Sequence, residues 1–183
     1  MKELSLNILD ITYNSIKANA EKIEISISES ISANLIQIEI KDNGHGMDHE
    51  LLEKVTDPFV TTRTTRKVGL GIPLFKQSAE DTDGKFSISS KIGEGTAVYA
   101  SFRLDHLDRA PIGDISSTMV SLIQANDQIH FICQCLEEGM KTSEILSKFG
   151  INKSDSNYER CRHFISTVKT RKVFKEISSN YTF

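Results

Sequence analysis

A carboxylate followed by two glycines is the first feature of this sequence that could do chemistry. Asp42 follows an alternating run of apolar and polar residues, and Gly44 and Gly46 come directly after it. A carboxylate only accepts hydrogen bonds, and adenine presents an exocyclic amine as a donor on its base-pairing edge. Glycines lack a Cβ, so a flat ring can approach the main chain, and Met47 could cover one of its faces. The stretch predicts a purine-binding turn, although an ordinary strand-to-helix turn in which Asp42 caps a local group has the same composition.

Two polar side chains near the N-terminus form a second candidate site. Asp10 and Asn14 are four residues apart in a segment with helical spacing, so both lie on one face of the predicted helix. An amide oxygen is a hard ligand that suits Mg²⁺ bound together with phosphates. A carboxylate one turn away could act as the catalytic base that orients and deprotonates a water. Chance placement of both on a polar helix face is the alternative.

A third pattern combines cations, glycines and the start of a helix. The threonine-rich run TTRTTRKVGLGI supplies the residues Arg63, Arg66, Lys67, Gly69, Leu70 and Gly71. Free N–H groups and the dipole at a helix N-terminus favour binding of a phosphate. The preceding cations could reach the β- and γ-phosphates of a nucleotide. A flexible basic loop before an ordinary helix is the alternative. Thr96, at the turn GEGT, adds a hydroxyl that could lie near the base beside Asp42.

The elements that must position these groups can be predicted from hydrophobic periodicity. Helical spacing covers Lys2 to Ala18, and a short helix at 49–55 has Asp48 as its N-cap. A longer helix spans 69–84 and is closed by Gly84. The predicted strands are 22–28, 35–41, 85–92 and 97–104. This order predicts an α/β fold, a two-layer sandwich of a mixed sheet backed by helices.

The last part of the chain has a different composition. Residues 1–104 form the predicted nucleotide-binding domain, 105–113 a linker, and 114–183 a small helical appendage. Its predicted helices are 114–124, 128–138, 142–149 and 156–168. Net charge is −3 overall, yet residues 148–183 hold eight Lys or Arg and three Asp or Glu, so the rest is acidic. A helix-turn-helix outline within 140–183 makes nucleic acid an alternative partner, against which the polar Ser156 and Asn157 argue.

Three cysteines, no secretory signal and no apolar run of membrane length favour a cytoplasmic protein that does not enter a membrane. The oligomeric state is left open.

Taken in order, these clusters resemble the histidine-kinase-like ATPases, also called the GHKL or Bergerat-fold group. The segment LDITYNSIKA is similar to the family's asparagine box, and DNGHGM to its first glycine box. DPFVTT resembles a segment of sensor kinases, GLGI the second glycine box, and GEGTAVYASF the last box. The resemblance covers residues 1–104 and implies ATP and Mg²⁺ as cofactors.

The resemblance also implies roles for particular residues. Asn14 would ligate Mg²⁺, Asp42 would bind the adenine amine, and Thr96 would reach the base through water. The glycines of both boxes would line the pocket, under a lid at 57–68. Hydrolytic branches place Glu where Asp10 stands, and Asp is shorter by about 1.5 Å, so strong hydrolysis is not expected.

A second departure is that Lys67 and Val68 stand where the second glycine box has another Gly and a small residue.

Sensor kinases carry a phosphoacceptor histidine on a helix before the asparagine box, and this chain starts only a few residues ahead of it. We therefore expect a stand-alone ATPase or protein kinase in regulation, with a protein partner or substrate. A nucleotide-sensing module or a transcription regulator with a basic C-terminal region is the alternative.

Overall fold

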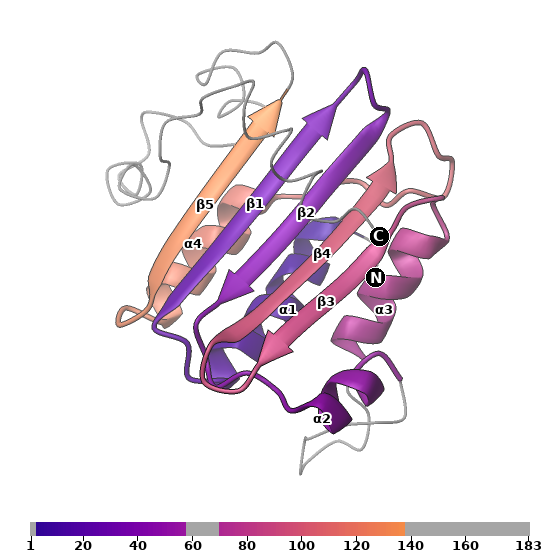
Figure 1. The fold of residues 1–183 in the computed structure, drawn as a ribbon. Coiled ribbons are helices and arrows are strands. Elements are labelled where there is room, and N and C mark those ends of the chain that lie inside the picture. The colour runs from indigo at the N-terminus through magenta and orange to yellow at the C-terminus, as the bar shows by residue number, and fades with distance from the viewer. Residues whose placement is uncertain (1–2, 58–69, 138–183) are drawn as a thin grey trace.

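The computed structural model describes residues 3–57 and 70–137, which form a five-stranded mixed sheet with helices packed on one face (Figure 1). The strands are β1 (Lys22–Ser30), β2 (Leu35–Asp42), β3 (Phe86–Lys91), β4 (Gly95–Arg103) and β5 (His130–Glu137). The helices are α1 (Leu4–Lys17), α2 (His49–Lys54), α3 (Gly71–Glu80) and α4 (Ile115–Ala125). The strand order is β3-β4-β2-β1-β5, with only the β1–β5 pair parallel among these strands. The predicted two-layer α/β fold is confirmed.

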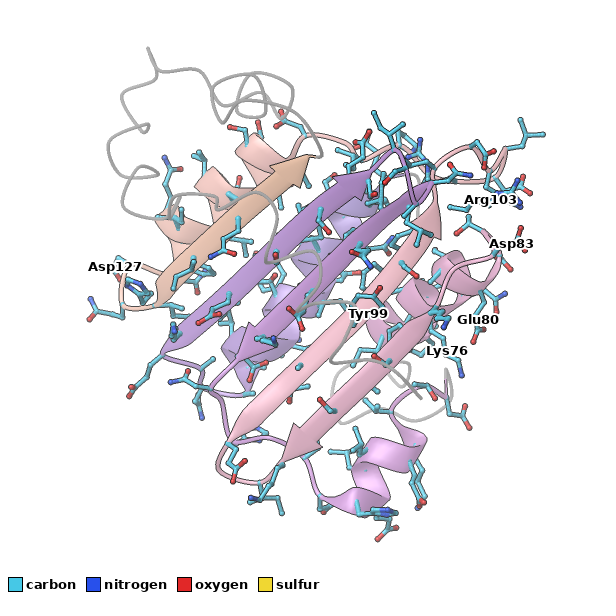
Figure 2. The ribbon with its side chains drawn as sticks, turned by 45° about the horizontal axis from the view of Figure 1, so that its top comes forward. Lys76, Glu80, Asp83, Tyr99, Arg103 and Asp127 are labelled. Atoms are coloured by element: carbon cyan, nitrogen blue, oxygen red, sulfur yellow. The ribbon has the colours of Figure 1, made fainter. Side chains whose placement is uncertain are left out.

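Alternating isoleucines explain why the helices pack on one face of the sheet. On β1 the buried residues Ile23, Ile25 and Ile27 alternate with polar ones, as strand geometry requires for a half-covered sheet. Ile25 lies opposite Ile40 of β2, and α1 covers both strands with apolar residues at helical spacing. Each such side chain contributes roughly 1.5–3 kcal/mol when it is buried. Tyr99 of β4 lies on the other face, away from the helices (Figure 2).

The predictions for the first 104 residues are close to the observed elements, with one shift at α3. This helix begins at Gly71 and ends at Glu80, so it is shorter than the predicted 69–84. The left-handed residue after it is Asp83, with φ of 55°. Gly84 is required for another reason, because a Cβ there would lie 1.8 Å from the carbonyl oxygen of Ser101.

The helix predicted for residues 128–138 is wrong, because residues 130–137 form strand β5. This strand pairs in parallel with β1, and Phe131 and Cys133 are buried against the core. The helix predicted for 114–124 is confirmed as α4, which provides the crossover that a parallel pair needs. The predicted helices at 142–149 and 156–168, and the helix-turn-helix outline, lie outside the described residues. The predicted domain limits stay a prediction.

An exposed ion-pair cluster joins the end of β4 to the turn after α3 (Figure 2). Arg103 Nη1 lies 3.0 Å from Asp83 Oδ2, and Arg103 Nε lies 2.7 Å from Asp105 Oδ1. The Asn34 side chain donates to Asp105, and this bond, followed by Arg103, lowers the pKa of that carboxyl. Exposed pairs of this kind add little to the free energy of unfolding.

Within residues 3–57 and 70–137, no helix combines the length and the apolar character that crossing a membrane would require.

Candidate functional site

Helix α1 presents Asp10 and Asn14 to the start of α3. Both side chains are partly buried, and they lie one turn apart on the same side of the helix. A Cβ built on Gly71 would lie 3.4 Å from Asp10 Cβ and 3.8 Å from Asn14 Nδ2. The second predicted cluster and part of the third therefore meet at the N-terminus of α3.

The first turn of α3 suits an anion without side-chain caps. Its N-cap residue, Leu70, makes no capping hydrogen bond with its side chain and is 44% exposed. The first N–H groups of any α-helix have no partner within the helix, and Pro73, near the start, has no N–H to satisfy. The helix dipole adds partial positive charge at this end. The start of α3 can therefore accept a phosphate beside Asn14.

Asp42 is held in place by three hydrogen bonds. Its Oδ2 accepts from Ser15 Oγ at 2.6 Å, and its Oδ1 accepts from Gly44 N at 2.9 Å and Thr96 N at 3.2 Å. The bond to Gly44 is the local cap that the sequence left as an alternative. A carboxylate has about four acceptor positions, so Oδ2 keeps one for a ligand. Asp42 is thus both a structural cap and an oriented acceptor.

The glycine loop is compressed between α1 and the β3–β4 hairpin. A Cβ on Gly44 would lie 2.7 Å from the carbonyl oxygen of Ala18. A Cβ on Gly46, whose φ is +67°, would lie 2.0 Å from the carbonyl oxygen of Lys91. The sequence predicted that these glycines admit a base. That role stays a prediction. The structure shows a packing reason for the two glycines, because the loop could not fit against its neighbours with side chains there.

A row of polar side chains crosses the sheet at this end of the strands. Ser90, Thr96 and Asp42 lie directly opposite one another on β3, β4 and β2. Ser90 Oγ lies 2.9 Å from Thr96 Oγ1 and also accepts a hydrogen bond from Met47 N at 2.8 Å. The predicted neighbours Asp42, Thr96 and Met47 are therefore brought together, with Ser90 at their centre.

Three residues of the site could not be assigned from the sequence patterns. Ser15 links α1 to Asp42, and Ser90 links the hairpin to the glycine loop. Asn43 Oδ1 accepts from the main-chain N–H groups of Glu21 and Lys22, at 2.9 and 2.8 Å, and so ties the loop to β1. Position beside Asp42 was a usable signal for Asn43. Nothing in the sequence marks the two serines, because strand register and helix packing decide their partners.

Part of the predicted site lies outside the described residues. These residues are Arg63, Arg66, Lys67 and Gly69, together with the predicted lid except Asp57. The described residues contain no group of three or more His, Cys, Asp or Glu side chains placed to hold a metal. A lone amide such as Asn14 fits Mg²⁺, which keeps several waters and is bound largely through phosphates.

A comparison with known families gives this arrangement a context. The family described as histidine kinase-, DNA gyrase B-, and HSP90-like ATPase matches residues 2–106, more than half of the 183 residues. The chain belongs to this ATPase family. It is 35% identical over 85 residues to a putative sensor protein of Shewanella frigidimarina, covering 46% of this chain and 13% of that protein. It is 31% identical over 96 residues to sporulation kinase C of Bacillus subtilis, covering 52% and 22%.

Among solved structures, the fold of this chain is similar to that of the N-terminal domain of a DNA repair protein. That match has a TM-score of 0.51 and 20% identity, and covers 77% of this chain and 51% of that one, so it shows the fold alone. The chain spans less than a quarter of each of the two curated relatives. Family membership therefore shows a histidine-kinase-like ATPase domain, as the resemblance implied.

Proposed function

We propose that this member of the ATPase family binds Mg·ATP at the α1–α3 end of the sheet and acts in regulation, as an ATPase or as a kinase of a protein partner. One observation carries the proposal: neighbouring residues of α1 serve both ends of the site. Asn14 faces the start of α3, and Ser15 holds Asp42. A purine at Asp42 and phosphates at α3 would then lie on two adjacent sides of the same turn of α1.

The residues present fit the nucleotide. Asp42 keeps an acceptor position for an amine, Asn14 is not fully buried, and Gly71 leaves room beside Asp10. Asn14 would ligate Mg²⁺ through its amide oxygen, and the start of α3 would hold phosphate oxygens.

Bound ATP would supply the phosphoryl group. Its phosphates would also carry much of the negative charge, which the cations of the predicted lid would neutralise. Asp10 would orient a water or a hydroxyl of a protein partner. Because the Asp side chain is shorter than the Glu of hydrolytic branches, hydrolysis would be slow. The residues assigned to the phosphates in this proposal are Arg63, Arg66, Lys67, Gly69, Leu70 and Gly71.

Calorimetric titration with ATP, with and without Mg²⁺, tests the proposal. Wild type should bind ATP more tightly with Mg²⁺, and Asn14→Ala should lose that gain while it keeps Mg²⁺-free binding. Asn7→Ala removes the same amide from the same helix two turns away, where the side chain is 1% exposed, and should keep the gain. Absence of ATP binding by folded wild type would refute the proposed function.

A nucleotide-sensing module is the second candidate. The presence of Asp at position 10 favours it, because the hydrolytic branches of the family that this sequence resembles carry Glu at that position. Phosphate release from ATP separates the two functions. An enzyme releases or transfers phosphate in a manner that Asp10→Asn abolishes. A sensor binds ATP and returns it intact, with or without a protein partner.

A further inference from the structure

Ser90 has more hydrogen-bond partners than it has hydrogens to give. Its Oγ lies 2.8 Å from Met47 N, 2.9 Å from the carbonyl oxygen of Gly95 and 2.9 Å from Thr96 Oγ1. An N–H group only donates and a carbonyl oxygen only accepts, whereas a serine hydroxyl has one hydrogen. The bond to Gly95 uses that hydrogen. Thr96 must therefore be the donor in its bond to Ser90.

The direction of the Thr96 hydroxyl decides what the site offers to a base. With its hydrogen given to Ser90, Thr96 Oγ1 can only accept further bonds. The carboxylate of Asp42 also only accepts, and its Oδ1 is already filled by the N–H groups of Gly44 and Thr96. The positions left at Thr96 Oγ1 and Asp42 Oδ2 are both acceptors. They match a group that carries hydrogens and repel one that carries lone pairs.

We propose that Ser90 is a positioning residue that sets base specificity by locking the Thr96 hydroxyl as an acceptor. The proposal rests on the proposed function and deepens it. A 6-amino purine presents two hydrogens to the acceptor pair, directly or through water. A 6-oxo purine presents an oxygen to it. Without the lock, the Thr96 hydroxyl could turn and donate to that oxygen, so discrimination against 6-oxo purines depends on Ser90.

Wild-type protein alone provides the first test, by equilibrium binding of three triphosphates. These are ATP, ITP with a 6-oxo group, and the triphosphate of unsubstituted purine riboside. The expected order of affinity is ATP, then the unsubstituted purine, then ITP, with ATP at least about tenfold tighter than ITP. A hydroxyl free to turn would donate to the oxo group. ITP that binds as well as the unsubstituted purine would therefore overturn the proposal.

Variants of the full chain provide the second test, with the ratio of ATP to ITP affinity as the readout. Ser90→Ala should lower this ratio by about tenfold, whereas Ser90→Thr keeps the hydroxyl and should keep most of the ratio. Ser89→Ala changes the exposed neighbour, whose side chain alternates to the other face of β3, and should leave the ratio unchanged.

The outcomes separate this inference from the proposed function. A ratio in Ser90→Ala equal to that of wild type overturns the inference and leaves ATP binding intact. Wild type that binds none of the three nucleotides overturns the proposed function and the inference with it. Thermal unfolding of each variant shows that a changed ratio comes from folded protein.

Discussion

Replacement of Asp42 by Asn is the most direct test of the base site, because the change keeps size and shape, removes the charge and turns one acceptor oxygen into an NH₂ donor. The amide can keep its oxygen toward the N–H groups of Gly44 and Thr96, which bind Oδ1. Its NH₂ group then replaces Oδ2, and Ser15 Oγ can turn to accept from it. The fold should therefore survive with a loss of about 1 kcal/mol in unfolding free energy.

Binding should suffer far more than stability. The base amine loses a charged acceptor and meets a donor that is left without a partner, which together cost about 3 kcal/mol, or roughly a hundredfold in Kd. Calorimetric titration with ATP measures the loss. Asp48→Asn is the matched control, because Asp48 caps α2 through Leu51 N and Asn caps as well as Asp. ATP affinity of folded Asp42→Asn within about threefold of wild type would refute the assignment of the base site.

Three further predictions concern hydrolysis, the glycine loop and helix α4. Asp10→Glu should raise phosphate release about tenfold, since the longer acid reaches the position used by hydrolytic relatives in the family resemblance; a rate equal to wild type would contradict this. Gly46→Ala should lower the unfolding free energy in urea by at least about 2 kcal/mol, and Gly93→Ala by less, since Gly93 shares a positive φ but a Cβ there meets nothing within 4 Å. Asp114→Ala should cost about 1 kcal/mol at neutral pH, because Asp114 caps α4 by accepting from Ser117. That hydrogen bond holds the pKa of Asp114 below its ordinary 3.8, so the difference from wild type should persist above pH 3.8 and fade as the pH falls through the lowered value; a pH-independent difference would point to another cause.

Periodicity predicted the elements of the sheet that are close in sequence, and tertiary pairing decided the rest. The alternating runs that became β1 and β2 needed no information beyond their own residues. The run that became β5 interrupts its alternation at Ile132, and its strand state depends on a partner more than a hundred residues earlier, at Ile23 and Ile25. A sequence pattern carries no signal for such a distant pairing.

The candidate site followed the same division. Asp42 and Asn14 could be selected from the sequence, because a carboxylate can bind an amine and an amide oxygen can bind a metal ion. Their roles stay a prediction. The hydroxyls that orient them could not, since Ser15 and Ser90 are among many serines in this chain. Their partners depend on which strands lie side by side and on how α1 packs over them. Sequence motifs indicate which residues could be reactive, whereas the fold determines which residues position them.

The parallel β1–β5 pair has a consequence for how this protein can be divided. A protein ended at residue 106, where the family match stops, would lack α4 and β5. Strand β1, which is rich in isoleucine, would then become an edge strand. Its main-chain groups from Lys22 to Glu29 would lose their β5 partners. Such margins recruit other chains and promote aggregation. A fragment meant for solution work should therefore extend at least through Glu137, so that β1 remains an interior strand.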